Sequence, residues 1–461
     1  MSQYQKTIYI FTRDLRLDDN IALINALKKS VYVIPVFIFN PKQIGSSNKY
    51  KSDKCIQFMC ESLDELNNEL RHKNTKLFMF HDNPENVVKN MIHDDIEIEC
   101  VIMSSDYTPF AIERENKIKE ICEKNNISFE KYENHMLTGA DQVLKKDGTM
   151  YQKFTPYYRN AILINVNNII KNLHGNYITN KYRIQHEYKG DIHKFYKFDE
   201  KTLVQGGRNK ALQIIKKIKN FDNYDKTRDY PSENTTLLSA YLKFGCVSVR
   251  EVYRKFKKYL TSTNKLFVQL YWRDFYMALI YHYPQHLLYK NQEELYSIRW
   301  QNRTDYFNYW CLGNTGIPII DAGMRQLNTT GWMHNRVRMI VANFLIKILH
   351  IDWRWGEQYF AQKLVDYDVF NNNGGWGWSS SFIADSQPYF RVFNPWRQTE
   401  KYDKNCEYIK TWIPELRQVP EKDILKWDIM HKNYNINYPK PIIMDIKKEA
   451  RKTIQLYKQK K

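Results

Sequence analysis

Four clusters of side chains in the second half of the chain could bind a phosphate, a nucleobase or a planar cofactor. In one of them, Gln269 and Arg273 lie four positions apart, so on a helix they share one face. Trp272 and Asp274 flank Arg273. An amide, an indole and a guanidinium together can hold a nucleobase or a phosphate. The alternative for this cluster is an exposed ion-pair helix with one tryptophan in the core.

Two more clusters favour anion binding at the start of a helix. The hydroxyl-rich segment 235–239 precedes a helical pattern, where hydroxyls and backbone N–H groups suit a phosphate. A plain N-cap is the simpler interpretation of this segment taken alone. The segment 331–339 brings Arg336 and Arg338 beside the amide of Asn335, which also suits an anion.

The fourth cluster combines acids, amides and glycines. Asp366 and Asp368 are followed by Asn371–Asn373, two glycines, Trp376 and Trp378. A Gly-Gly pair lets the backbone approach a ligand closely. The acidic pair could bind a metal, but no histidine lies nearby at ligand spacing, so we expect no metal site.

Short apolar strands alternate with amphipathic helices over residues 1–132 and predict an α/β domain with a parallel, doubly wound sheet. The expected strands are 6–11, 31–39, 76–80, 100–104 and 127–132. The expected helices are 20–29, 53–71, 84–92 and 109–125. No GxGxxG motif follows the first strand, so a dinucleotide site of the usual kind is not expected there.

The remaining chain divides into a connector and a helical domain. Residues 133–204 are polar and weakly periodic, so we expect an interdomain connector with a short helix near 157–172. From residue 205 to 461, apolar residues recur every three or four positions and predict an all-α domain. Its expected helices include 209–220, 249–259, 265–282, 319–327, 335–350 and 357–364, with the Asn- and Gly-rich run 371–378 as a break between helices.

Composition limits the class of protein. The chain has 461 residues, of which 43% are hydrophobic, enough for two or three folded domains and against global disorder. A net charge of +19 favours a polyanionic partner, nucleic acid above all, although a Lys-rich surface that only aids solubility is the alternative. The 34 tyrosines and 11 tryptophans suit base stacking or a planar cofactor, or simply a large aromatic core.

Cysteines and targeting signals point to an intracellular protein. The seven cysteines show no CxxC motif and no paired spacing, which favours a reducing compartment without disulfides or a Cys-based zinc site. The sequence shows no signal peptide and no apolar run long enough to span a membrane. We therefore expect a soluble intracellular monomer.

The clusters, in this order and at this spacing, resemble the photolyase/cryptochrome family, and class I cyclobutane pyrimidine dimer photolyases in particular, over nearly the whole chain. The resembling segments are FTRDLR at 11–16, FTPY at 154–157, TTLLS at 235–239, LYWRDF at 270–275, MRQL at 324–327, TGWMHNRVRM at 330–339, DWRWGE at 352–357 and PYFRVFNP at 388–395. The resemblance implies fully reduced FAD in the helical domain, which passes an electron under light to a flipped-out pyrimidine dimer. The basic charge then has a partner in the DNA backbone.

The resemblance also assigns residues to roles. FAD contacts fall at Tyr224, Thr235, Thr236, Leu237, Leu238, Ser239, Gln269, Arg273, Arg338, Asp366, Tyr367, Asp368 and Asn372. Lesion or DNA contacts fall at Arg228, Trp272, Asn335, Arg336, Met339, Trp378 and Gln398. Trp376, Trp353 and Trp300 match the chain of tryptophans that carries electrons from the surface to the flavin. Gln269 and Asn372 also fall at catalytic positions, Asn372 near flavin N5.

Gln269 departs from the class I pattern, which has a dimer-contacting Glu there. Glu can donate a proton or a charge-assisted hydrogen bond, whereas Gln can donate only N–H. Gln at this position resembles (6-4) photolyases and animal cryptochromes, while His334-Asn335 with Met339 resembles the dimer-specific group. A (6-4) photolyase and a photoreceptor without repair activity are therefore the alternatives. The chain stops soon after the family core near residue 439, which favours repair.

The sequence leaves open whether the protein binds a second, light-harvesting chromophore. The folate-binding Asn-Glu pair of the family aligns with Ile112-Glu113, so only Glu113 is kept. Folate, a deazaflavin and no antenna are all compatible with this pattern. Leu266 occupies a position where one branch of the family has a ring beside the adenine of FAD.

Overall fold

The computed structural model describes residues 2–288, 298–383 and 385–458. They form two compact units. The first unit comprises Met1–Phe198, Val204–Asp222 and Thr236–Leu288, and the second comprises Asp199–Leu203, Asn223–Thr235 and Tyr289–Lys461. The expected domain boundaries at residues 132 and 204 stay a prediction.

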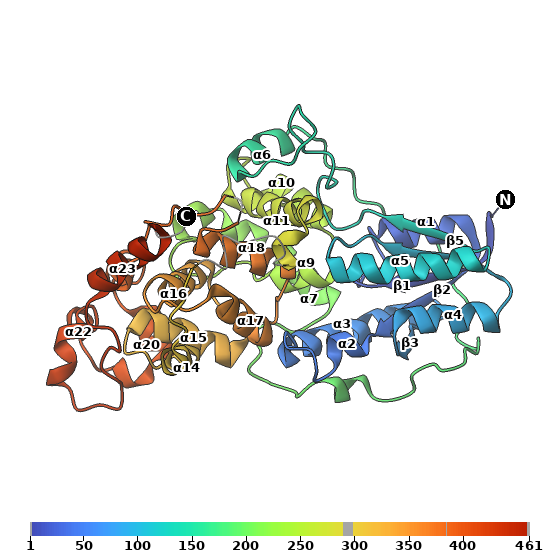
Figure 1. Cartoon of the computed structure of the whole chain (residues 1–461). Helices are drawn as coiled ribbons and strands as arrows, with labels where there is room; N and C mark the ends of the chain where they lie inside the picture. The colour runs from blue at the N-terminus through green and yellow to red at the C-terminus, as the bar shows by residue number, and fades with distance from the viewer. Residues whose placement is uncertain (1, 289–297, 384, 459–461) are drawn as a thin grey trace. The chain divides into compact units, whose positions relative to one another are not determined.

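Five parallel strands form the sheet of the first unit (Figure 1). They are β1 (Tyr4–Phe11), β2 (Ser30–Phe39), β3 (Phe78–His81), β4 (Ile98–Ser104) and β5 (Ser128–Tyr132). Their order is β3-β2-β1-β4-β5, and every neighbouring pair is parallel. The expected doubly wound α/β sheet is confirmed, because each short apolar run pairs as a buried parallel strand.

The helices between the strands also match their patterns. They are α1 (Ile21–Lys29), α2 (Pro41–Ile44), α3 (Asp53–Arg71), α4 (Pro84–Asp94) and α5 (Pro109–Lys124). Side chains of Asn20, Ser52 and Thr108 accept hydrogen bonds from backbone N–H groups at the starts of α1, α3 and α5. Such caps satisfy donors that a helix leaves free, so they fix where each helix begins. Ile8 and Ile10 of β1 pack in one apolar cluster with residues of α4 and α5.

The connector helix differs from its expected position. Helix α6 spans Phe154–Ala161 rather than 157–172. It begins early because Phe154 and Tyr157 are both buried and pack against Phe275. It ends early because most of residues 162–172 are β-branched or Asn, which lower helix propensity.

The other α-helices of the described residues follow the connector. The first unit adds α7 (Arg208–Lys216), α9 (Ser239–Phe244), α10 (Val249–Tyr259), α11 (Lys265–His282) and α12 (Gln285–Leu288). The second unit contains α8 (Tyr224–Thr227), α14 (Thr304–Leu312), α15 (Pro318–Thr330), α16 (Asn335–Lys347), α17 (Trp353–Lys363), α18 (Val369–Ser380), α19 (Pro395–Tyr402), α20 (Glu407–Trp412), α21 (Glu421–Ile424), α22 (Trp427–Met430) and α23 (Ile446–Lys458). The described residues beyond 205 contain no β-strand, as expected of an all-α domain.

The expected break at 371–378 is wrong, because this run lies inside helix α18. Asp368 caps the helix, and its side chain accepts from the N–H groups of Phe370 and Asn371. Gly377 is required by packing, since a Cβ there would meet Ile383 Cδ1 at 2.0 Å. Capping and close packing thus outweigh the low helix propensity of the three glycines in α18.

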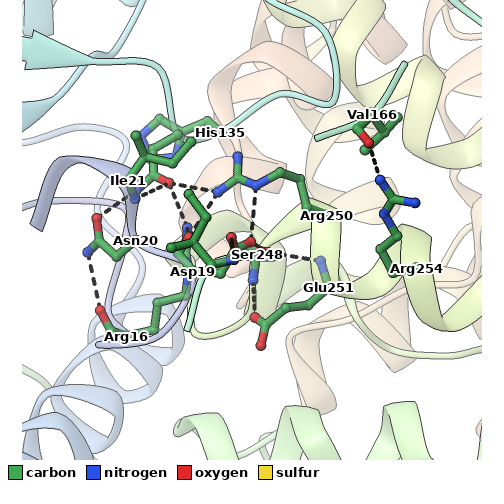
Figure 2. Close-up of polar contacts among 12 residues, drawn as sticks. Arg16, Asp19, Asn20, Ile21, His135, Val166, Ser248, Arg250, Glu251 and Arg254 are labelled. Atoms are coloured by element: carbon green, nitrogen blue, oxygen red, sulfur yellow. Dashed lines mark hydrogen bonds and ion pairs between the residues drawn. The ribbon is translucent and has the colours of Figure 1, made fainter. Parts of the chain in front are cut away.

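A buried polar cluster joins the sheet to α10 within the first unit. We call Arg16, Asp19, Asn134, Ser248 and Arg250 the Asp19 cluster; the four that Figure 2 labels point toward one another. Arg250 Nε lies 3.0 Å from Asp19 Oδ2, and Ser248 Oγ donates to the same oxygen. Both guanidiniums donate to Asn134 Oδ1, at 2.9 Å from Arg16 and 3.2 Å from Arg250. The cluster therefore ties the loop after β1, the segment just after β5 and the start of α10 together.

Candidate functional site

The residues expected to contact FAD divide between the two units. The first unit holds Thr236, Leu237, Leu238, Ser239, Gln269 and Arg273. The second unit holds Tyr224, Thr235, Arg338, Asp366, Tyr367, Asp368 and Asn372.

In the second unit, an acid and a guanidinium are paired at the start of the Asp366–Asp368 segment. Arg338 Nη2 donates to both carboxylate oxygens of Asp366, at 3.0 and 3.2 Å. Arg338 Nε also donates to Met333 O at 2.7 Å, which fixes the plane of the guanidinium. The side chain of Asp366 is 4% exposed, so a guanidinium that contacts both of its oxygens offsets the cost of burying its charge. Arg338 and Asp366, two of the expected FAD contacts, are therefore joined as an ion pair.

The side chains that follow are oriented by α17 and α18. Asn372 Nδ2 donates to Glu357 Oε1 at 2.9 Å and to the backbone oxygen of Glu357 at 3.2 Å. Because its N–H groups face Glu357, Asn372 offers its Oδ1, an acceptor, to other partners. Asp368 caps α18, and Tyr367 packs against the apolar core of the unit. Glu357, which holds the Asn372 amide, was not expected from the sequence because it lies one helix away.

In the first unit, segment 236–239 leads into helix α9. Leu237 has a φ of 54°, an uncommon conformation for a residue with a Cβ. Arg273 Nη2 donates to Leu242 O at 3.4 Å, and Arg273 Nη1 donates to His135 O. Arg273 therefore links α9 to the connector. Gln269 is half-buried, and its Nε2 donates to Lys265 O at 3.4 Å.

A buried carboxyl beside Arg273 holds the connector. Asp274 Oδ2 accepts from the backbone N–H groups of Leu137 at 2.7 Å and Thr138 at 3.1 Å. Burial raises the pKa of Asp274 to about 7, while Arg273 and these two N–H groups oppose the shift. Asp274 thus has a structural role, in place of the exposed ion pair that was the alternative for this cluster.

The expected tryptophans of the electron chain lie in the second unit. Trp353 is 2% and Trp376 is 3% exposed, whereas Trp300 is half-buried against the same core. A Cβ on Gly356 would meet Trp376 Cη2 at 2.1 Å, so glycine permits the close approach of α17 and α18. Trp310, which no motif pointed to, lies with its ring 6.2 Å from that of Trp376, centroid to centroid.

The residues expected on the lesion side are also placed. The ring of Trp272 stacks on Phe154 with centroids 3.6 Å apart and planes 8° from parallel. On α16, Asn335 Nδ2 lies 3.8 Å from Met339 Sδ. Trp378 lies in α18 and Gln398 lies in α19. Tyr224 begins the short helix α8, and the Arg228 guanidinium lies 5.9 Å from the centre of the Tyr224 ring. Arg336 pairs with Asp229.

A cavity of about 520 Å³ lies beside the ends of β4 and β5. Its lining includes Asp106, Ile112, Glu133 and Tyr281. Glu113, the expected antenna contact, is not among the lining residues; its exposed side chain pairs with Lys117 at 2.7 Å. The antenna role of Glu113 therefore stays a prediction without support from its contacts.

Metal-binding clusters and membrane-spanning helices are absent from the described ranges. Within 2–288, 298–383 and 385–458, no three His, Cys, Asp or Glu residues gather as metal ligands would. In the same ranges, no helix has both the length and the apolar character needed to cross a bilayer. All seven cysteines are buried and unbridged.

Comparison with known proteins gives consistent matches. Residues 7–165 match the family described as DNA photolyase, and residues 266–459 match the FAD binding domain of DNA photolyase. A deoxyribodipyrimidine photo-lyase from Buchnera aphidicola is 35% identical, over 99% of this chain and 97% of its own. An archaeal photolyase from Sulfolobus tokodaii, solved with two FAD molecules, is 39% identical with a TM-score of 0.89, over 99% of this chain and 100% of its own. A Synechocystis cryptochrome, 24% identical with a TM-score of 0.90 over 99% of this chain and 100% of its own, shares the fold.

Proposed function

Since the chain belongs to the DNA photolyase family, we propose that it repairs cyclobutane pyrimidine dimers in DNA under blue or near-ultraviolet light. The observation that carries this proposal is the 35% identity to the Buchnera aphidicola deoxyribodipyrimidine photo-lyase over 99% of the chain. The match over residues 266–459 identifies an FAD-binding domain. In its fully reduced form, FAD supplies the excited electron that breaks the bonds between the two pyrimidines.

The donor and acceptor groups of the expected site fit FAD. Hydroxyls and backbone N–H groups of segment 235–239 suit its phosphates. The Arg338–Asp366 pair supplies a guanidinium and a carboxylate for the polar edge of the flavin. Asn372, held by Glu357, offers a neutral acceptor, so this residue adds no charge next to the flavin.

The expected lesion contacts suit a flipped pyrimidine pair. Trp272 and Trp378 supply indole faces that stack on bases without sequence preference. Asn335 supplies an amide for base edges, and Met339 beside it supplies an apolar contact. Weakened pairing at a damaged site lowers the cost of flipping, which favours binding of damaged over intact DNA.

One residue favours a second candidate, repair of the (6-4) photoproduct. Gln269 is half-buried on α11 and can donate only N–H to a base carbonyl, as in that branch of the family. A cryptochrome-type photoreceptor without repair activity shares the fold and is the third alternative.

The repair reaction can be tested with a duplex that carries one cyclobutane thymine dimer. We expect the chemically reduced holoenzyme to restore two thymines under blue light and to leave the dimer intact in the dark. A parallel duplex with a (6-4) photoproduct tests the second candidate. If neither lesion is repaired by protein with FAD bound and reduced, the photoreceptor alternative gains support.

Replacing Trp376 with phenylalanine should slow photoreduction of the oxidised flavin severalfold and spare repair by enzyme that is reduced beforehand. Phenylalanine keeps the packing against Phe360 but is far harder to oxidise than an indole. The measurement is the decay of flavin absorbance under light with a thiol reductant. Trp427→Phe, a core tryptophan that is 1% exposed and outside the proposed chain, is the control. Equal rates in both variants and the wild type would contradict the assignment.

Replacing Phe154 with leucine should weaken binding of dimer-bearing DNA about fivefold, because a stacked aromatic pair contributes about 1 kcal/mol beyond its buried area. Phe154 is 6% exposed, so it acts through Trp272 by holding the indole plane. Phe154→Tyr keeps the ring and should restore the affinity. Binding of undamaged duplex should not change in either variant, and a parallel loss there would contradict a positioning role.

A further inference from the structure

Arg336, expected to contact the lesion, is occupied by an acid of the same unit. Its Nη2 donates to Asp229 Oδ1 at 2.6 Å, and its guanidinium lies 4.4 Å from the centre of the Tyr402 ring. The Arg336 side chain is 14% exposed, and that of Asp229 is 38% exposed. The contact between Arg336 and Asp229 is therefore a defined pair at the edge of solvent and not a mobile surface contact.

The surroundings of this pair are strongly basic. Arg228 precedes Asp229, and Arg338 lies two residues after Arg336 on α16. Arg338 is already balanced by Asp366, while Lys401 lies over the Tyr402 ring at 5.1 Å. A carboxylate in such a group makes the same charge-assisted contact to Arg336 that a DNA phosphate would make.

We propose that Asp229 is a specificity-determining residue that keeps Arg336 from binding undamaged DNA. This inference rests on the proposed function. An intact duplex offers phosphates alone, and the Asp229–Arg336 pair withholds Arg336 from them. A lesion that enters the site adds stacking and amide contacts, and these offset the cost of separating Arg336 from Asp229. Arg336 then contributes to the binding of damaged DNA and not to the binding of intact DNA.

The proposal makes a prediction about salt dependence. Each phosphate contact adds about 0.9 to the slope of log affinity against log salt concentration. In Asp229→Asn, the slope for undamaged duplex should steepen by about 0.9, and the affinity for that duplex should rise about fivefold, the factor for the ~1 kcal/mol of a partly exposed ion pair. The slope for dimer-bearing duplex should stay the same, because Arg336 already contacts DNA there.

The experiment measures dark binding of the holoenzyme to matched duplexes, undamaged or with one cyclobutane or one (6-4) lesion, over a range of salt concentrations. Asp305→Asn is the matched control, because Asp305 is an acid of the same unit that pairs with Arg303 and is 50% exposed. Flavin absorbance and circular dichroism check that both variants are folded and loaded. The expected result is a change in slope for Asp229→Asn alone, and for undamaged duplex alone.

Three outcomes would overturn the inference. Equal changes in Asp229→Asn and Asp305→Asn would show an effect of net charge. Equal changes of slope for damaged and undamaged duplexes, or no change, would show that Asp229 does not select between them. Wild-type protein that prefers neither lesion would remove the selectivity itself and would also contradict the proposed function, which keeps the two failures distinguishable.

Discussion

Replacing Asp19 with alanine should lower the free energy of unfolding of the first unit by about 3–5 kcal/mol, the cost of leaving buried charges without their partner. Asp19 is 0% exposed and faces Arg250, 3% exposed, at 3.0 Å, with Arg16 beside it at 1%. Burial and the neighbouring Arg250 already lower the pKa of Arg16. Asp19 also has a φ of 48°, which alanine adopts less readily than Asp. Both effects act in the same direction.

The loss can be measured by urea unfolding and by hydrogen exchange in peptides from β1 and α10. Glu123→Ala is the control, because Glu123 pairs with Lys119 on the surface, where both side chains are more than half exposed. Such a pair contributes about 0.2–1 kcal/mol at most. A similar loss in the two variants would mean that the Asp19 cluster does not stabilise the contact between the sheet and α10.

The α/β fold could be predicted because each of its elements has a local signal. Buried parallel strands are continuous apolar runs, so β2 and β4 stood out directly. Helix α3 carries its own N-cap at Ser52, and its expected bounds, 53–71, are those observed. Elements with such local signals can be located from their own residues, which is why the sequence predicted their positions.

Helix α18 could not be predicted because its stability is tertiary. Its sequence contains the Gly374-Gly375 pair and three asparagines, all poor helix formers. The contacts that stabilise it are the Asp368 cap, the bond from Asn372 to Glu357 and the packing of Gly377 under Ile383. The bond to Glu357 comes from another helix, and a capping aspartate looks the same in sequence as a cofactor ligand.

The candidate site shows the same contrast between residues that local motifs predict and contacts that form only on folding. The family resemblance assigned both Arg338 and Asp366 to the flavin site, and the structure shows the two side chains as an ion pair. The sequence did not reveal Asp229 or Glu357, which contact site residues from other segments of the chain. A single sequence carries no record of such pairs, because partners far apart in the chain meet only after folding.

His334 should make the second unit about 3 kcal/mol less stable as the pH falls from 6.5 to 4. Burial first, and then Arg336 and Arg338, lower the pKa of His334 to about 4, with Arg228 acting in the same direction and Asp229 opposing it. Between pH 6.5 and 4, the unfolded chain therefore binds a proton at His334 that the folded chain does not bind. The stability is complete above pH 6.5 and is lost progressively below it.

His334 has a neutral imidazole in the folded protein because the ring caps helix α16. His334 Nδ1 accepts from the backbone N–H of Arg336 at 3.1 Å and caps α16, so protonation would remove this acceptor. His334→Asn keeps a capping acceptor without a titrating group. Urea midpoints between pH 7 and pH 4 should therefore fall less steeply in His334→Asn than in the wild type. Parallel curves would mean that His334 binds its proton equally well in both states, and that the cap at the start of α16 does not depend on a neutral ring.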